Sequence, residues 1–278
     1  RRSGRLTWAK ILLNAHAAHQ SHCGNDKSRR NHPKGFDRLQ LGGSNGIDCP
    51  HPILHQVHDA GGGDARLIDD WIITHIHADH ASGLESLAFS RWYGAHKKTN
   101  VVGVGAVLED LLQIHDVSAL SKQTTIAGER DPLRARDVYN SVLLRYDEPV
   151  QLGLFSVEIA RATHVVPTTA IRVTAPNGRS FAYSADTVFD STLLSWLASA
   201  DVFAHDCAGG PIHASCDELL SKTPVQDRSR CLLVHRSDIS AGTVYNMREA
   251  GFVIPQAGHT VTLMQDGNVA HRALRLNN

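Results

Sequence analysis

The chain has 278 residues, enough to bury a full hydrophobic core in one large or two small domains. A hydrophobic fraction of 42% and a charged fraction of 20% are typical of a soluble globular protein, and no apolar run approaches the ~20 residues that a transmembrane helix needs. The net charge of zero hides an asymmetry: residues 1–38 hold nine Lys and Arg against two Asp and Glu (+7), whereas residues 39–278 hold 19 against 26 (−7).

Residues 1–35 form a basic extension that is rich in Arg, His and Ser and poor in acidic residues. We expect it to be flexible or loosely docked, because it carries no clear cleavage signature, although organelle targeting is not excluded. Apolar side chains at helical spacing predict one short amphipathic helix within it: Leu6, Trp8, Ile11, Leu12 and Leu13. We assign residues 36–278 to a single domain.

The chain contains five cysteines, an odd number, and none of them forms a CxxC pair. This usage argues against a disulfide framework or a cysteine zinc site and favours a reducing compartment, which predicts a cytoplasmic protein. The cysteines are Cys23, Cys49, Cys207, Cys216 and Cys231.

Residues 38–41 alternate like a first strand, and the glycine loop at residues 42–46 follows them. This loop lacks the GxGxxG and Walker spacings, so we interpret it as a tight turn that lets the backbone approach a nearby site. Residues 53–58 predict a second strand, after which Asp59 could orient a metal-binding histidine. We expect the histidines of this region to be structural or solvent-facing: His51, His55 and His58.

Residues 74–80, THIHADH, come directly after the apolar run at residues 71–73 and before a helical pattern that begins at Leu84. His75 and His77 are two residues apart, which places both imidazoles on one side of an extended chain. Asp79 and His80 follow at the start of the helix. Imidazole and carboxylate together form a ligand set suited to zinc, manganese or iron.

The rest of the chain alternates short strands with helices, and residues 117–150 lack a clear pattern. Asn177-Gly178 predicts a two-residue hairpin turn between two strands. The ranges that predict strands are 101–104, 154–160, 170–173, 180–183, 202–204 and 231–234; those that predict helices are 106–115, 191–198, 217–222 and 241–250. This order predicts two packed sheets with outer helices.

Three of the predicted strands end on a residue that can bind a metal, namely His164, Asp186 and His235. Gly258-His259-Thr260 also has the form of a ligand motif, but it comes last in a predicted terminal strand, and we expect a structural role for it.

The THIHADH segment with Gly83 resembles the HxHxDH signature of the metallo-β-lactamase superfamily. This resemblance implies an α/β fold, an αββα four-layer sandwich of two mixed sheets flanked by helices. It also implies two divalent ions, zinc or else manganese or iron, that share a hydroxide and lie roughly 3.5–4 Å apart. By the resemblance, His75, His77 and His164 hold one ion, Asp79, His80 and His235 hold the other, and Asp186 bridges them.

Two further segments resemble motifs of one superfamily branch, the tRNA-processing enzyme ribonuclease Z: residues 204–207, AHDC, and 212–215, IHAS. The resemblance implies that His205 and Asp206 belong to the catalytic site with Asp79, that Asp206 orients His213, and that His213 protonates the leaving oxygen after hydroxide attacks phosphorus. Two departures are visible: Asp206 stands where the family has Glu, and the Gly/Pro-rich basic arm that grips tRNA is missing.

We therefore expect a dinuclear metal-dependent phosphodiesterase that cleaves RNA or a small or cyclic phosphodiester, without a membrane partner. Relatives are commonly homodimers, so a dimer is expected by analogy. Two alternatives stay open: a metallo-hydrolase of a lactone or thioester, and a non-catalytic scaffold in an RNA-processing or regulatory assembly.

Overall fold

The computed structural model describes residues 8–13, 45–59, 63–236, 239–256, 259–264, 266 and 268–272. The strand predicted at residues 38–41, the start of the glycine loop and Cys23 lie outside this range. None of the helices it describes has the length and apolar character to cross a membrane.

The first sheet has four strands, all parallel, in the order β2-β3-β4-β5. The strands are β2 Asn45–Ile47, β3 Asp70–Ile72, β4 Thr99–Gly103 and β5 Tyr139–Leu143. The helices and 3₁₀ segments that connect them are α1 Ile53–Asp59, η1 Ala65–Leu67, α2 Ala78–Ala81, α3 Leu84–Ala95, α4 Gly105–Val117, η2 Ala119–Lys122 and α5 Ala135–Val138.

The second sheet has six strands in the order β11-β10-β9-β8-β7-β6 and is mixed. The strands are β6 Val150–Leu152, β7 Phe155–Ala162, β8 Thr168–Thr174, β9 Ser180–Tyr183, β10 Val202–Asp206 and β11 Cys231–Val234. The helices on this side of the molecule are α6 Ser191–Ala198, α7 Cys216–Lys222, α8 Val225–Arg228 and α9 Ala241–Glu249.

A third, antiparallel sheet has the order β1-β12-β13, with β1 Trp8–Leu13, β12 His259–Met264 and β13 Val269–Arg272. Trp8 lies opposite Met264 and Leu13 opposite His259. The apolar segment near the N-terminus is therefore a strand and not the predicted amphipathic helix. Pairing with β12 decides its conformation, which no pattern inside the segment can reveal.

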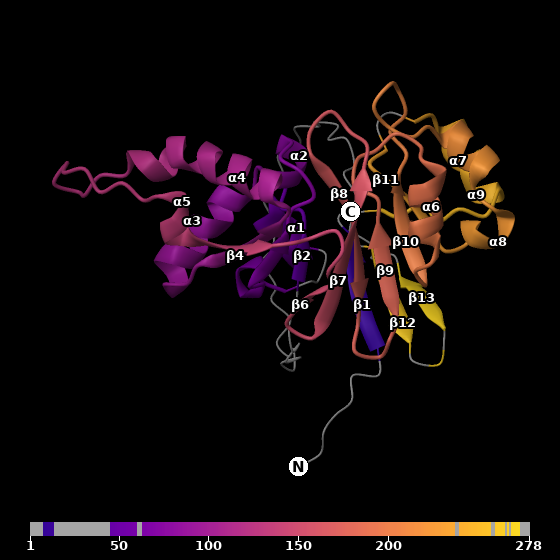
Figure 1. The fold of residues 1–278 in the computed structure, drawn as a ribbon, viewed down its shortest axis with the longest axis horizontal. Coiled ribbons are helices and arrows are strands. Elements are labelled where there is room, and N and C mark those ends of the chain that lie inside the picture. Colours follow the sequence, from indigo (N-terminus) through magenta and orange to yellow (C-terminus); the bar gives the residue numbers. More distant parts are fainter. Residues whose placement is uncertain are drawn as a thin grey trace, which may run out of the picture.

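These elements form layers (Figure 1). One core cluster joins the buried sides of α3 and α4 through the four-stranded sheet to residues of β6, β7 and β8. Another joins the opposite face of the six-stranded sheet to α6, α7 and α9, while β12 packs on the inner face of β9, β10 and β11. Sheets flanked by helices on both sides confirm the predicted α/β sandwich.

Residues 53–58 are helical and do not form the predicted strand. Ile53 and Val57 are buried and four residues apart, which is one helical turn, while His55 and His58 are exposed. His51 is exposed as well, so the solvent-facing role expected for these three histidines is confirmed.

Gly46 does not form a turn at the site. It lies in β2 opposite Trp71 of β3, and a Cβ atom there would overlap the Trp71 ring. Close packing against an indole, rather than approach to a metal, explains this glycine.

The predicted hairpin between β8 and β9 is present with a longer turn. Thr174 lies opposite Ser180, the Ala175 N–H donates to the Arg179 carbonyl at 2.8 Å, and the Gly178 N–H donates to the Ala175 carbonyl at 2.9 Å. The loop therefore has three residues, with Gly178 at φ +80°. Pro176 before Asn177 favours this geometry over the two-residue turn.

Cys207 and Cys216 form a disulfide, which the odd number of cysteines did not predict. The two residues approach each other only because the chain after β10 folds back to α7, bringing their Cα atoms to 5.6 Å. Cys49 and Cys231 are buried free thiols.

The strand directions explain where the functional side chains meet. β7 and β9 are both antiparallel to β8, and β9, β10 and β11 are mutually parallel, so four strands run the same way. The carboxyl ends of these strands lie at one edge of the sheet, where their following residues can share a site.

Candidate metal centre and acid histidine

The THIHADH segment forms the turn from β3 into α2. The Thr74 carbonyl accepts a 3.2 Å hydrogen bond from the Thr169 N–H of β8, which ties this turn to the six-stranded sheet. His75 and His80 are buried, His77 is half-buried, and the Asp79 side chain is 42% exposed. The side chains of this segment therefore line one site from its buried interior to its exposed surface.

The residues at the ends of β7, β9 and β11 converge on this turn. Asp186 is central: its carboxylate oxygens lie 3.3 Å from His80 Nε2, 3.5 Å from His235 Nε2, 3.7 Å from His75 Nε2 and 3.8 Å from His164 Nε2. His164 Nε2 is 3.2 Å from His77 Nδ1, and His235 Nε2 is 3.1 Å from an Asp79 oxygen. All seven predicted metal ligands meet in space.

Within the described residues these side chains form groups whose potential ligand atoms lie within 4.8 Å of one another. One group is His75, His77, His164 and Asp186; a second is Asp79, His80, Asp186 and His235. Asp186 belongs to both, which matches the predicted division into two ion positions with a bridging carboxylate.

The hydrogen bonds around the imidazoles fit metal binding. His75 Nδ1 lies 3.0 Å from the Thr74 hydroxyl, His80 Nδ1 lies 2.7 Å from Asp48, and His164 Nδ1 lies 3.2 Å from the Ile212 carbonyl. An Nδ1–H donated to each oxygen fixes the tautomer and leaves the Nε2 lone pair directed into the cluster. The Nε2 atoms of His75 and His80 are buried there without a hydrogen-bond partner, as is Oδ1 of Asp186. Such orphaned atoms suit a cation.

Asp48 is a functional residue that sequence reasoning missed. Its carboxylate accepts hydrogen bonds from the Thr74 backbone N–H at 2.8 Å, from the Thr74 hydroxyl at 2.9 Å and from His80 Nδ1 at 2.7 Å. It therefore orients His80 directly and His75 through Thr74, the role we had considered for Asp59, whose side chain lies outside the described residues. A carboxylate just after a short strand was the available signal.

Asp206 holds two histidines at once. Its Oδ2 accepts from His213 Nδ1 at 2.7 Å and its Oδ1 from His235 Nδ1 at 3.3 Å, while the backbone N–H groups of Thr187 and Ala208 donate at 2.9 and 3.0 Å. A third group of possible metal ligands joins Asp206 and His213 to Asp186 and His235. Because the Asp206 oxygens already accept four hydrogen bonds, this carboxylate is better suited to orienting its neighbours than to binding a cation.

His205 does not join the cluster. It is fully buried, and its Nδ1 lies 2.8 Å from the Asp206 carbonyl. Successive residues of a strand point to opposite faces, so an Asp206 that faces the site directs His205 away from it. The geometry gives His205 no contact with the residues that could bind substrate, contrary to the catalytic role expected for it.

The electrostatics of the cluster favour positive charge. Burial lowers the pKa of His75 to about 3, which keeps this imidazole neutral. Burial also lowers the pKa of His80, but the carboxylates of Asp48, Asp186 and Asp79 outweigh it and raise the pKa to about 12. The contact with His235 at 3.1 Å, and then the nearby His80 imidazole, hold the pKa of Asp79 far below its usual range. Ionised carboxylates thus surround a point where a cation is stabilised.

The backbone at the site is unusual. Among the described residues, the non-glycine residues with positive φ are Asp48 (55°), His96 (52°), Ala185 (54°) and His235 (49°). His96 ends α3, whereas the other three border the cluster. The chain is therefore held in left-handed turns where strands deliver site residues.

Comparison with known families identifies the group to which this site belongs. The profile of the family described as "Anti-Pycsar protein Apyc1" matches residues 45–258, which include all seven converging ligands and His213. The chain belongs to this family. An Apyc1 from Paenibacillus sp. (strain J14) is 32% identical over 201 residues, covering 69% of this chain and 77% of the relative. Apyc1 of Bacillus phage BSP38 is 28% identical over the same length and with the same coverage.

Another relative of this Apyc1-family chain is the "cGMP-dependent 3′,5′-cGMP phosphodiesterase A" of Dictyostelium discoideum. It is 26% identical over 217 residues, which cover 71% of this chain and 23% of that protein.

Solved structures show a shared fold. The metallo-β-lactamase fold protein YhfI of Bacillus subtilis superposes with a TM-score of 0.63 at 17% identity, over 81% of this chain and 89% of that one. The short form of human tRNase Z superposes with a TM-score of 0.58 at 16% identity, over 90% and 97%. The chain thus has the metallo-β-lactamase fold, and His and Asp clusters among its described residues could bind divalent metal.

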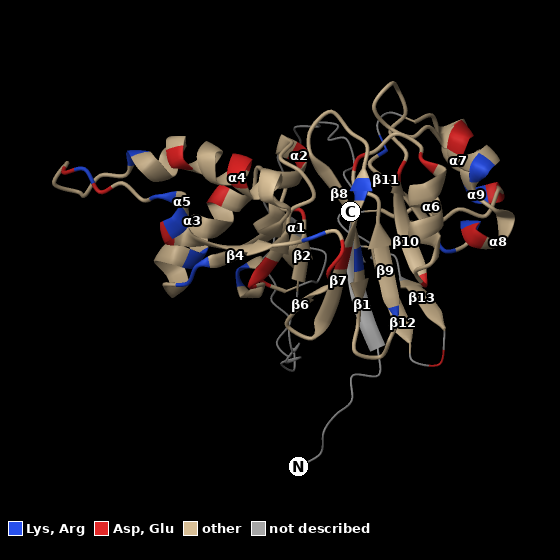
Figure 2. Cartoon of the chain, viewed as in Figure 1, with Lys and Arg blue, Asp and Glu red and all other residues tan. Residues whose placement is uncertain are grey.

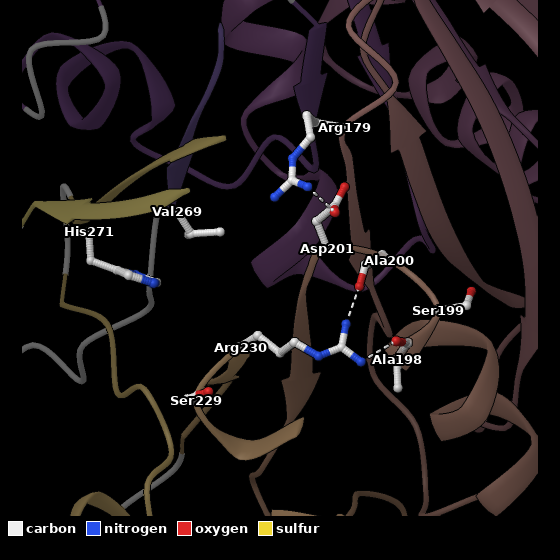
Figure 3. Close-up of a pocket in the computed structure, with 9 residues that line it drawn as sticks. All are labelled: Arg179, Ala198, Ser199, Ala200, Asp201, Ser229, Arg230, Val269 and His271. Atoms are coloured by element: carbon white, nitrogen blue, oxygen red, sulfur yellow. Dashed lines mark hydrogen bonds and ion pairs between the residues drawn. The ribbon is translucent and has the colours of Figure 1, made fainter. Parts of the chain in front are cut away.

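A cavity of about 710 Å³ lies elsewhere in this Apyc1-family protein (Figure 3). It is lined by residues at the starts of β9, β10 and β11, the opposite ends of the strands from the metal cluster. Arg179 pairs there with Asp201 at 2.7 Å, and Arg230 donates to the carbonyls of Ala198 and Ala200 after α6. Arg230 thus stabilises the end of α6, and none of the candidate metal ligands lines this cavity.

Proposed function

We propose that this protein is a metal-dependent phosphodiesterase that hydrolyses small cyclic nucleotides with a 3′,5′-phosphodiester. The observation that carries the proposal is the position of the His213–Asp206 pair, bonded at 2.7 Å and directly beside the two groups of candidate ligands. A site for cations next to a proton donor supplies what phosphodiester hydrolysis requires.

In this proposal His75, His77 and His164 hold one ion, while Asp79, His80 and His235 hold the second. Asp186 serves both, since it belongs to both groups. The mixed His and carboxylate donors favour zinc, with manganese or iron as alternatives. When bound, two such ions polarise the phosphoryl oxygens and lower the pKa of water to near 7.

In this proposal, side chains of the protein donate the proton to the leaving group and orient the proton donor. Because His213 uses Nδ1 to bond Asp206, its Nε2 is the nitrogen that can give a proton to the departing oxygen. Asp206 fixes the orientation of the ring through this 2.7 Å contact. Asp79 is the most exposed of the candidate carboxylates, so this proposal places it at the open side of the site.

The need for a general acid distinguishes these phosphodiesters from esters with good leaving groups. A sugar alkoxide is a poor leaving group, so its departure benefits from protonation, whereas the thiolate of a thioester leaves without it. The cyclic-nucleotide substrate is supported by the Dictyostelium relative, which is named as a 3′,5′-cGMP phosphodiesterase.

RNA is less favoured than a small substrate. Figure 2 presents Lys and Arg interspersed with Asp and Glu along the described helices, rather than as a basic stripe. Residues 39–278 carry a net charge of −7, which opposes nonspecific binding to a nucleic-acid backbone.

The test is metal analysis coupled to a substrate panel. Protein stripped by a chelator and reloaded with Zn²⁺ or Mn²⁺ is expected to hydrolyse 3′,5′-cyclic nucleotides and bis(p-nitrophenyl) phosphate. Precursor tRNA, a lactone and a thioester complete the panel. Turnover of the lactone or thioester alone would favour an ester hydrolase. Cleavage of tRNA alone would favour an endoribonuclease. Protein that binds no metal would favour a non-catalytic scaffold.

A further inference from the structure

The loop that carries His213 has its two ends joined by a disulfide. Cys207 follows Asp206 at the end of β10, and Cys216 is the first residue of α7, with the two Cα atoms 5.6 Å apart. Both cysteines are buried in the core cluster under the six-stranded sheet. The disulfide thus joins the residue next to the carboxylate partner of His213 to a helix.

The helix end of this connection is rigid. Ser215 caps α7: its hydroxyl accepts from the Glu218 N–H at 3.2 Å, and the Glu218 carboxylate accepts from the Ser215 N–H at 2.9 Å. Leu219, one turn further, is fully buried. Cys216 is therefore a fixed point from which the loop can be held.

The interior of the loop is ordered by few contacts. Gly209 and Gly210 have φ of +76° and +81°, with no neighbouring atom within 4 Å of a Cβ built on either. The backbone bonds across the loop run from the Gly209 N–H to the Ala214 carbonyl at 2.9 Å and from the Ala214 N–H to the Thr187 carbonyl at 2.7 Å. Consecutive glycines leave the chain many conformations unless its ends are fixed.

We propose that the Cys207–Cys216 cross-link is a positioning device for catalysis: it holds the 208–215 loop so that His213 stays on Asp206. The inference rests on the proposed phosphodiesterase function. Cys207 and Cys216 are positioning residues, because they act through His213 and touch neither substrate nor metal. Loss of the cross-link lets His213 leave its place, and misplacing a reacting group by about 1 Å costs up to ~100-fold in rate.

This role has a signature that a purely structural disulfide lacks. If the cross-link serves the proton donor, its loss must harm substrates that need protonation and spare those that do not. A 3′,5′-cyclic nucleotide expels a sugar alkoxide, whereas bis(p-nitrophenyl) phosphate expels p-nitrophenolate, a stable anion.

The experiment compares Cys207→Ala, Cys216→Ala and the double variant with the wild type. Cys231→Ala is the matched control, because Cys231 is also fully buried in the same core cluster but forms no disulfide. Peptide mapping without reductant establishes the cross-link, and metal content, turnover of both substrates and hydrogen exchange of amides 208–214 are measured on each protein.

We expect each single variant and the double variant to lose about tenfold or more on the cyclic nucleotide and less than about twofold on bis(p-nitrophenyl) phosphate, at unchanged metal content. The double variant should lose no more than a single one, since either change removes the same bond. Equal losses on both substrates, no loss on either, or free thiols in the wild type would overturn the proposal.

Failure of the proposed function is distinguishable from failure of this inference. Wild-type protein that hydrolyses neither phosphodiester refutes the function. Hydrogen exchange then decides the inference: amides 208–214 that exchange about tenfold faster in the three variants, but not in Cys231→Ala, support a cross-link that orders the His213 loop, and unchanged exchange refutes it.

Discussion

His213 Nδ1 lies 2.7 Å from Oδ2 of Asp206, and the other oxygen of the same carboxylate lies 3.3 Å from His235 Nδ1. One buried carboxylate thus orients both the proposed proton donor and a proposed metal ligand. Substitutions at His213 and at Asp206 should therefore have different consequences.

His213→Ala is expected to lower turnover of 3′,5′-cyclic nucleotides by ~10²–10⁴-fold, because it removes the proton donor, while the protein keeps its metal. Asp206→Ala is expected to lower both turnover and metal content, since His235 also loses its support. Steady-state kinetics and metal analysis of the same samples check this. His55→Ala, at an exposed histidine of α1, is the control. Undiminished turnover in His213→Ala would exclude the acid role.

Asp48→Asn should weaken metal binding without removing any ligand. The carboxylate orients His80 and Thr74, and loss of such a supporting partner typically reduces metal affinity by ~10–100-fold. Competition with a chromogenic chelator measures the affinity. Asp64→Asn, at an exposed carboxylate that pairs with Arg66, should leave it unchanged. Equal affinities in Asp48→Asn and the wild type would refute the orienting role of Asp48.

Removal of the metals should lower thermal stability, because the cluster then holds ionised carboxylates around an uncompensated centre. Zn²⁺ added to stripped protein should raise Tm in a concentration-dependent manner. At a free Zn²⁺ concentration of about 100 times Kd, the free energy of unfolding should increase by about 2.7 kcal/mol. Differential scanning fluorimetry across a zinc titration provides the measurement. His77→Ala should flatten the response, and a wild-type Tm that ignores zinc would contradict a folded-state metal site.

Gly83→Ala and Gly94→Ala should change stability in opposite directions. A Cβ at Gly83 would lie 2.5 Å from the Pro50 carbonyl oxygen and 2.7 Å from that of Cys49, so backbone must shift, at a cost of about 1–3 kcal/mol. Gly94 in α3 has no neighbour within 4 Å of such an atom, and alanine there should gain about 0.5–1 kcal/mol. Denaturant unfolding measures both, and a tolerated Gly83→Ala would mean that this contact is loose.

His115 should make the fold less stable in mild acid. Burial lowers its pKa, against the opposing charges of Glu85 and Asp116, and its ring stacks on Tyr139. As pH falls below about 6.5, the unfolded chain binds a proton at this position that the folded chain resists, so stability present above that pH is lost. Between pH 7 and pH 5, the wild type should lose more Tm than His115→Phe, which keeps a ring but does not titrate. Parallel pH profiles would contradict this.

The convergence of the candidate metal ligands could be predicted because they lie in the segments that directly follow β3, β7, β9 and β11, and short apolar runs reveal such strands locally. Three features could not be predicted, because only tertiary contacts bring their partners together: the role of Asp48, the Cys207–Cys216 disulfide and the β1–β12 pairing. The expected site included both His205 and Asp206, although alternation along a strand allows only one of two neighbours to face it. The helix at residues 53–59 was missed because two apolar residues one turn apart are too few to separate a helical period from a strand.

The left-handed turns at Asp48, Ala185 and His235 limit how this protein can be redesigned. At each position the positive φ is unfavourable for a residue with a side chain, so contacts elsewhere in the fold must stabilise this backbone conformation. Ala185→Gly would relieve that cost locally and give the adjoining Asp186 more freedom. Thermostability and metal affinity should therefore change in opposite directions at this residue, so a screen that selects for heat resistance alone would favour variants with weaker metal binding.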